Sequence, residues 1–233
     1  VYWPAFLMAA GLPLPRQVFA HGWWTNEGVK ISKSLGNTID PIELIDAFGI
    51  DAVRYFLIRE VSFGQDGDFS RQALINRLNS DLANAYGNLV QRVLSFIYKN
   101  GDAVVPAPGA LTSDDSTFLD LPKQFLPTIH EMQLNRYAEG VWALIAKANQ
   151  YVDEHKPWGL KKTDPERMNT VLYVLADFIR QIAILTQPLV PVASAKILNQ
   201  LAVSEGDRLF SAIDKQLLPG IKLLEPVGVF PRV

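Results

Sequence analysis

The strongest constraint on the fold is a recurrence of apolar residues in the middle of the chain. Apolar side chains return every three or four positions, at Leu74, Leu78, Leu82, Ala85, Leu89, Val93 and Ile97. That spacing places them on one face of an α-helix, so it predicts one long amphipathic helix over residues 70–99. A helix with a single apolar face must bury that face, so we expect partner helices.

The second half of the chain supplies such partners. Helical patterns cover residues 116–130, 134–155 and 163–186, and a further helix runs through Leu201. The residues of the second segment expected to face inward are Tyr137, Val141, Leu144, Ala148, Tyr151 and Val152. These segments predict an antiparallel α-helical bundle.

The start of the third segment allows two readings. Thr163 and Glu166 have the spacing of a capping box, whereas Asp164 followed by Pro165 offers a different cap with proline in the first turn. Both remain open from the sequence.

The first part of the chain is mixed in character. Residues 17–24 are rich in aromatic and β-branched side chains and predict a strand, and Asn26-Glu27-Gly28 predicts a turn. Asp40 and Asp51 are each placed to cap a short helix. A turn-rich break at residues 63–68 then precedes the long helix.

Length and composition fit this division. The chain has 233 residues, 48% hydrophobic and 20% charged, which is typical of globular domains. We expect two units, residues 1–69 and residues 70–233, in a mainly α protein. The net charge of −2 argues against general attraction to phosphates, so any nucleic-acid binding must use local sites.

Other whole-chain features concern location. No run of about 18 apolar residues is present, so we predict no membrane span. Cysteine is absent, which fits a reducing compartment, and we expect a cytoplasmic protein. The chain opens inside an apolar segment, Val1-Tyr2-Trp3-Pro4, so we expect it to be a piece of a longer polypeptide.

The loop at residues 30–34 carries two lysines and two serines and is followed by Gly36-Asn37. Most surface loops of this composition are only solvated. A glycine-flanked loop with two ammonium groups is nevertheless a good anion clamp, because lysine places a compact charge on a flexible stem. Such charges can stabilise negative charge that develops on leaving phosphates.

The segment Lys30-Ile31-Ser32-Lys33-Ser34 resembles the Lys-Met-Ser-Lys-Ser signature of class I aminoacyl-tRNA synthetases, with isoleucine replacing methionine. The resemblance implies that Lys30 and Lys33 are catalytic and bind ATP phosphates, with Lys33 the stronger candidate. It also places the Ile31 backbone at the adenine, and it adds Ser32 and Ser34 as residues that shape the ATP-binding loop.

Longer segments resemble methionyl-tRNA synthetases in particular. They are residues 59–70, with the run Gln65-Asp66-Gly67, the opening residues 1–5, and His21-Gly22-Trp23. The resemblance puts His21 among the ATP-binding residues, although a hydrogen-bonded histidine at a strand end is the commoner role. Trp23 is more often a packing residue.

Two further positions match that family's anticodon-binding pattern. Asn88 and Arg92 lie four residues apart and share one helix face, and Pro157-Trp158 follows the predicted end of a later helix. An amide, a guanidinium and an indole suit unstacked bases, although an exposed Asn/Arg pair is usually only solvated. The resemblance implies that these four residues bind the CAU anticodon of tRNA(Met).

As a whole, the resemblance implies the end of a Rossmann-type catalytic domain with a small α/β stem-contact region, followed by the anticodon-binding bundle. The implied activity is ATP-dependent ligation of methionine to tRNA(Met) through methionyl-adenylate, with Mg²⁺ accompanying ATP. The family's His-Ile-Gly-His signature is not in this sequence. We therefore expect an N-terminal catalytic portion elsewhere, a fragment inactive alone, and no zinc or other protein-bound metal in this part.

Two alternatives remain open from the sequence. One is another class I synthetase with a related bundle, specific for isoleucine, leucine or valine. The other is a non-catalytic tRNA-binding module.

Overall fold

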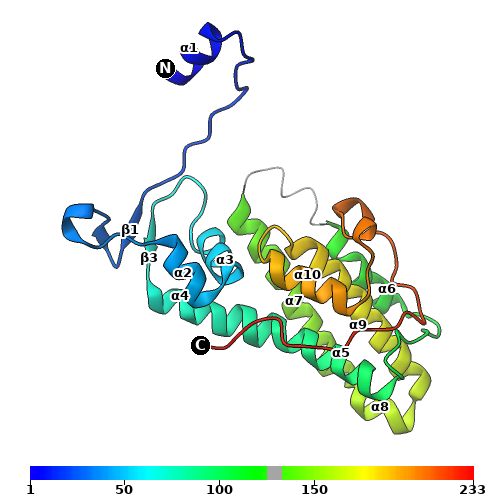
Figure 1. The fold of residues 1–233 in the computed structure, drawn as a ribbon. Helices are drawn as coiled ribbons and strands as arrows, with labels where there is room; N and C mark the ends of the chain where they lie inside the picture. The colour runs from blue at the N-terminus through cyan, green and yellow to red at the C-terminus, as the bar shows by residue number, and fades with distance from the viewer. Residues whose placement is uncertain (125–132) are drawn as a thin grey trace.

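The computed structural model describes residues 1–124 and 133–233, which form a mainly helical structure with one small sheet (Figure 1). The strands are β1 (Trp24–Asn26), β2 (Val29–Lys30) and β3 (Gly67–Phe69). The earlier helices are α1 (Tyr2–Ala9), α2 (Pro41–Phe48), α3 (Ile50–Glu60) and α4 (Arg71–Arg77). The later ones are α5 (Asn88–Asn100), α6 (Ser113–Asp120), α7 (Leu134–His155), α8 (Pro157–Thr163), α9 (Pro165–Thr186) and α10 (Pro191–Gln200).

The sheet has the order β2-β1-β3. Strands β1 and β2 form an antiparallel hairpin, and β3 lies parallel to β1 on its other side. The hairpin turn is Glu27-Gly28, with φ of 51° and 77°. Two positive φ values suit the twist of a two-residue hairpin, and the predicted turn is confirmed.

The predicted strand over residues 17–24 is wrong except for Trp24. Residues 17–23 have no regular secondary structure, because no described strand pairs with them. The first backbone contact to β3 comes where the Gly67 N–H donates to the Trp23 carbonyl over 2.8 Å. Before that point the chain runs as an extended connection from α1, which lies apart from the other helices (Figure 1).

The predicted helix over residues 70–99 is confirmed, with one addition. Ser70 caps its start by accepting the Ala73 N–H, and α4 continues into α5 through a π-helical segment, Leu78–Gly87. The wider π-turns shift which side chains face inward. Tyr86 is fully buried, whereas Ala85 is only half-buried.

Helix α9 is the centre of the bundle and packs against α5, α7, α8 and α10. It is long and apolar enough to span a membrane, but 94% of its most apolar stretch is buried inside the protein. It is therefore a core helix. The side chains of α7 that were predicted to face inward, listed above, are all buried.

Of the two caps proposed for α9, the structure has the second. The Asp164 carboxylate accepts the Arg167 N–H over 3.0 Å, and Pro165 begins the helix. The Thr163 hydroxyl donates instead to the Gly159 carbonyl within α8, a short helix that the sequence pattern did not predict.

Asp40 caps α2 as predicted, by accepting the Ile42 N–H over 2.8 Å. The same prediction for Asp51 is wrong, because this residue lies inside the first turn of α3. Its carboxylate accepts the N–H groups of Val192 and Ala193, at 3.0 and 2.6 Å, in the first turn of α10. Burial raises the pKa of the Asp51 carboxyl, and the two hydrogen bonds only partly offset that rise.

Helix α3 also joins the sheet region to the bundle. The Tyr55 hydroxyl donates to Asp81 over 2.9 Å, and its ring lies 4.1 Å from that of Trp142. Arg59 pairs with Glu139 of α7 at 2.8 Å. The buried side chains of α2, α3 and the bundle form one continuous core.

The predicted helix over residues 116–130 is wrong at both ends within the described residues: α6 begins earlier, because Thr112 and Asp115 form a capping box, and it ends at Asp120, before a 3-10 turn at residues 122–124. Residues 125–130 of that prediction lie outside the described residues. The Asp115 carboxylate is fully buried and accepts hydrogen bonds from Arg167 and Tyr151. Burial alone would raise its pKa, but these hydrogen bonds outweigh that effect and hold the pKa well below its usual range.

Candidate functional site

The lysine loop leaves the edge of the small sheet. Lys30 is the last residue of β2, and Lys33 begins a 3-10 turn, Lys33–Leu35. Both lysine side chains are exposed, and no ion pair involves either of them within residues 1–124 and 133–233. The loop therefore presents two ammonium groups to solvent, as an anion clamp requires.

Backbone and side-chain hydrogen bonds shape this loop. The hydroxyls of Ser32 and Ser34 lie 2.7 Å apart, and Ile31 between the lysines is half-buried. Gly36 closes the turn with φ of 65°, and its N–H donates to the Lys33 carbonyl. Asn37 bonds to the loop backbone on both sides of Ile31.

The hairpin below the loop is held by Asp68 in β3. Its carboxylate accepts the Thr25 hydroxyl over 2.6 Å and the Gly28 N–H over 2.8 Å. These two hydrogen bonds lower the pKa of the Asp68 carboxyl. The carboxylate thus ties the turn of the hairpin to the adjacent strand.

His21 lies on the extended chain before β1. Its Nδ1 is 2.8 Å from the carbonyl oxygen of Gly22, and the side chain is exposed. This contact is local, so the structure gives His21 no bond to the lysine loop. Its ATP-binding role stays a prediction.

The second candidate site lies on the bundle, where α5, α7 and α8 meet. Arg92 on α5 has its guanidinium carbon 5.1 Å from the centre of the Trp158 ring. The same guanidinium donates to the Asp153 carboxylate of α7 over 3.1 Å. Trp158 is 45% exposed at the start of α8, whereas the neighbouring Pro157 is buried. The structure therefore brings Arg92 and Trp158 together on an open surface.

Asn88 lies one helical turn before Arg92 and is exposed, so the predicted shared face is confirmed. Its side-chain oxygen accepts a hydrogen bond from Arg232 over 3.3 Å. Sequence reasoning missed both Arg232 and Asp153 as neighbours of this site. No local pattern could have indicated Arg232, because it is 144 residues from Asn88.

The side chains at this surface suit unstacked bases. An indole face can stack on a base, and an amide and a guanidinium can bond to base edges. Lys161 on α8 donates to the Asn100 side chain over 2.7 Å, which joins the last turn of α8 to the end of α5. Hydrogen bonds therefore connect α5 to both α7 and α8 beneath this surface.

No group of three or more histidine, aspartate and glutamate side chains within the described ranges is arranged to hold a metal ion. The lysine ammonium groups of the loop are not metal ligands.

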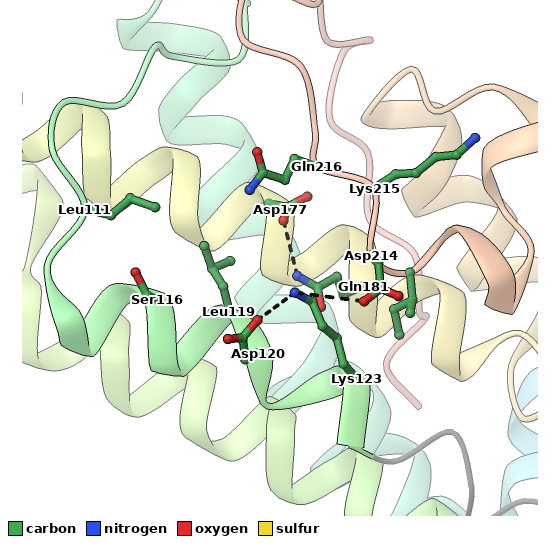
Figure 2. Close-up of a pocket in the computed structure, with 11 residues that line it drawn as sticks. Leu111, Ser116, Leu119, Asp120, Lys123, Asp177, Gln181, Asp214, Lys215 and Gln216 are labelled. Carbon is green, nitrogen blue, oxygen red and sulfur yellow. Dashed lines mark hydrogen bonds and ion pairs between the residues drawn. The ribbon is translucent and has the colours of Figure 1, made fainter.

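A small cavity of about 100 Å³ lies away from both sites, between α6, α9 and residues 213–216 (Figure 2). Lys123 lies between Asp120 and Asp214 at its mouth, at 2.6 and 3.9 Å. The Gln181 amide inside it donates to Asp177 over 3.2 Å. This cavity contains none of the predicted site residues.

Two family models match this chain, one over each half. The family model described as tRNA synthetases class I (M) matches residues 1–94. The model described as the anticodon binding domain of methionyl tRNA ligase matches residues 105–232.

The proteins similar to this chain include methionine–tRNA ligases of several bacteria. The methionine–tRNA ligase of Rickettsia felis is 51% identical over 241 residues, and that of Mesorhizobium japonicum is 49% identical over 238 residues. Both alignments cover 100% of this chain, but only 47% and 46% of those relatives. The solved structure of Mycobacterium tuberculosis methionyl-tRNA synthetase in complex with methionyl-adenylate superposes with a TM-score of 0.93 at 44% identity. It matches 100% of this chain and 47% of that one. The chain thus spans about half the length of the relatives it matches.

Proposed function

The chain belongs to the methionyl-tRNA synthetase family, and from this premise we propose that it supplies the ATP-phosphate loop and the anticodon-binding surface of an enzyme that joins methionine to tRNA(Met). The remaining half of such an enzyme would supply most of the methionine and adenosine pocket. The fragment alone is then inactive in methionine activation.

The proposed reaction has two steps. A methionine carboxylate oxygen attacks the α-phosphorus of ATP, the bond to the β-phosphate oxygen breaks, and pyrophosphate leaves. The terminal ribose hydroxyl of tRNA then attacks the carbonyl carbon of methionyl-adenylate, loses its proton, and releases AMP. Both steps depend mainly on positioning and on stabilisation of developing charge.

In the first step Lys30 and Lys33 contact the β- and γ-phosphates. Negative charge on these phosphates increases as pyrophosphate leaves, so a nearby ammonium group stabilises the transition state more than the ground state. The Ile31 backbone faces the adenine, Ser32 and Ser34 shape the loop, and Mg²⁺ arrives bound to ATP. His21 joins the ATP-binding residues through the family resemblance, and its contact in the structure is with the adjacent Gly22.

The anticodon of tRNA(Met) binds at Asn88, Arg92, Pro157 and Trp158. The observation that carries this proposal is the exposed pair of Arg92 and Trp158, which come from helices far apart in sequence and meet at 5.1 Å on an open face. Pro157 is buried and contributes by fixing the turn between the end of α7 and the start of α8. The indole then offers a face to one base.

We assign residues 1–69 to the end of a Rossmann-type catalytic domain with its stem-contact region, and residues 70–233 to an antiparallel bundle that binds the anticodon. In this assignment the continuous core between α3 and the bundle fixes the distance between the two sites. The absence of cysteine and the family membership suit a cytoplasmic enzyme.

The test uses Lys33→Ala in the full-length enzyme, with Lys162→Ala in α8 as a matched lysine control. We expect ATP–pyrophosphate exchange to fall on the order of 100-fold in the first variant, by analogy with removal of one preorganised charge-stabilising group. Methionine binding should be unchanged, and the control should retain full exchange. Equal exchange rates for Lys33→Ala and wild type would refute the phosphate role of the loop.

A further inference from the structure

The Asn37 side chain forms two hydrogen bonds to the backbone of the lysine loop. Its Oδ1 accepts the Ser32 N–H over 2.9 Å, and its Nδ2 donates to the Lys30 carbonyl over 3.0 Å. These two backbone groups flank Ile31. The Asn37 amide therefore binds the backbone on both sides of Ile31, between Lys30 and the turn that carries Lys33.

Asn37 is itself held by the sheet. The Asn26 side chain donates to the Asn37 carbonyl over 3.0 Å, and Asn26 lies in β1. Strand β1 is in turn paired with β3 through the register of Asn26 with Phe69. The central strand thus holds Asn37 through the Asn26 side chain, and the Asn37 side chain in turn holds the loop backbone.

Lys30 is also paired with Thr25 in the sheet, and Ile31 is half-buried, but the turn that carries Lys33 has few anchors of its own. Leu35, the apolar residue of the turn, is 63% exposed and does not anchor it in the core. The bond between Ser32 and Ser34 is internal to the loop and cannot orient the loop on the sheet. Ordering a backbone segment costs conformational entropy, so a turn without packing or hydrogen bonds to the rest of the protein samples many shapes.

We propose that Asn37 is a positioning residue for amino-acid activation, which sets the spacing and direction of Lys30 and Lys33 toward the ATP phosphates. This inference rests on the proposed function. The amide acts through the backbone and does not touch the nucleotide. Both of its groups are needed, because the Ser32 N–H requires an acceptor and the Lys30 carbonyl requires a donor.

That requirement separates asparagine from aspartate. An aspartate at this position could still accept the Ser32 N–H, but it would place an unprotonated oxygen against the Lys30 carbonyl. Two acceptors face to face repel, so the isosteric change breaks one side of the amide bridge while preserving its shape.

The experiment uses the full-length enzyme with Asn37→Ala, Asn37→Asp, Lys33→Ala and the double variant Asn37→Ala/Lys33→Ala. Asn76→Ala is the matched control, because the Asn76 side chain also accepts a hydrogen bond, from Gln72, on an exposed face of α4. We expect both Asn37 variants to lower kcat for pyrophosphate exchange on the order of 10- to 100-fold, as misplacement by about 1 Å can. Methionine affinity, tRNA affinity and the unfolding midpoint should match those of Asn76→Ala.

The double variant provides the readout that a merely structural role would not give. If Asn37 acts through the lysines, Asn37→Ala should cost much less in the Lys33→Ala background than alone. Independent effects that multiply in the double variant, or wild-type exchange in both Asn37 variants, would overturn the inference. A loss of exchange matched by a lower unfolding midpoint in both variants would overturn it too. If Lys33→Ala itself has no effect, the proposed function of the loop fails instead.

Discussion

Replacement of Trp158 by alanine in the full-length enzyme tests the bundle surface most directly. Base–aromatic stacking contributes about 1–3 kcal/mol per base, which corresponds to about 5- to 150-fold in affinity for tRNA. The side chain is 45% exposed, so its removal leaves no buried cavity. We therefore expect weaker tRNA(Met) binding without a comparable loss of folding stability.

The structure also sets a limit on the size of the effect. Arg92 lies over the Trp158 ring, and an exposed cation–π contact of this kind contributes about 0.5–1 kcal/mol. A base that stacks on the other face of the indole keeps this contact, so the contact cancels between free and bound protein and the loss of tRNA affinity in Trp158→Ala is limited to the stacking contribution. The Trp158→Phe variant keeps a ring for the base and for the guanidinium, and should lose less affinity than alanine.

The assay compares tRNA(Met) charging with tRNA-independent ATP–pyrophosphate exchange for both variants. Charging at low tRNA concentration should fall with affinity, whereas exchange should stay within about twofold of wild type, because the indole is remote from ATP. If exchange collapses together with charging, Trp158 is a structural residue and the stacking role is wrong. Unchanged tRNA affinity in Trp158→Ala would refute it as well.

Two further predictions concern the scaffold. Asp115→Asn should lower the free energy of unfolding at pH 7 by about 3 kcal/mol, because it leaves a partly buried arginine without its anion. The pKa of Asp115 is held low in the folded protein, so its contribution to the free energy of unfolding should be complete above about pH 5, begin to fall below about pH 4, and be lost only as the folded carboxyl protonates at still lower pH. Urea unfolding curves of wild type and Asp115→Asn should therefore approach one another steadily in acid, and a constant difference at every pH would contradict the ion-pair account. Gly22→Ala should displace the chain before β1, because the added methyl group would collide with the Gln65 backbone. Gly159→Ala is the control, since its methyl group meets no atom within 4 Å. The rate of pyrophosphate exchange and the thermal unfolding midpoint should fall in Gly22→Ala alone, and wild-type values in Gly22→Ala would contradict this packing.

Helices with strong local signals could be predicted from the sequence. Helix α7 spans residues 134–155 as predicted, since its apolar period and the following proline mark its face and its end. Asp40 caps α2 because a helix cap involves only the next few residues. The exposed face shared by Asn88 and Arg92 follows from their spacing alone.

Features that depend on distant partners could not be predicted in this way. Asp51 looks like a cap for its own helix, yet it bonds to α10, 141 residues further along. Residues 17–23 have the composition of a strand, but a strand requires a neighbour and they have none among the described elements. The π-helical turns of Leu78–Gly87 change which side chains are buried, and no helical period in the sequence indicates them. The ATP and anticodon roles of the site residues stay predictions.

The continuous helix from Arg71 to Asn100 connects the sheet region to the surface that carries Arg92. It begins next to β3, which pairs with the strand that supports the lysine loop, and it carries Arg92 roughly 30 Å away at the usual helical rise of about 1.5 Å per residue. Rotation by about 5° at the sheet end would therefore move Arg92 by about 3 Å.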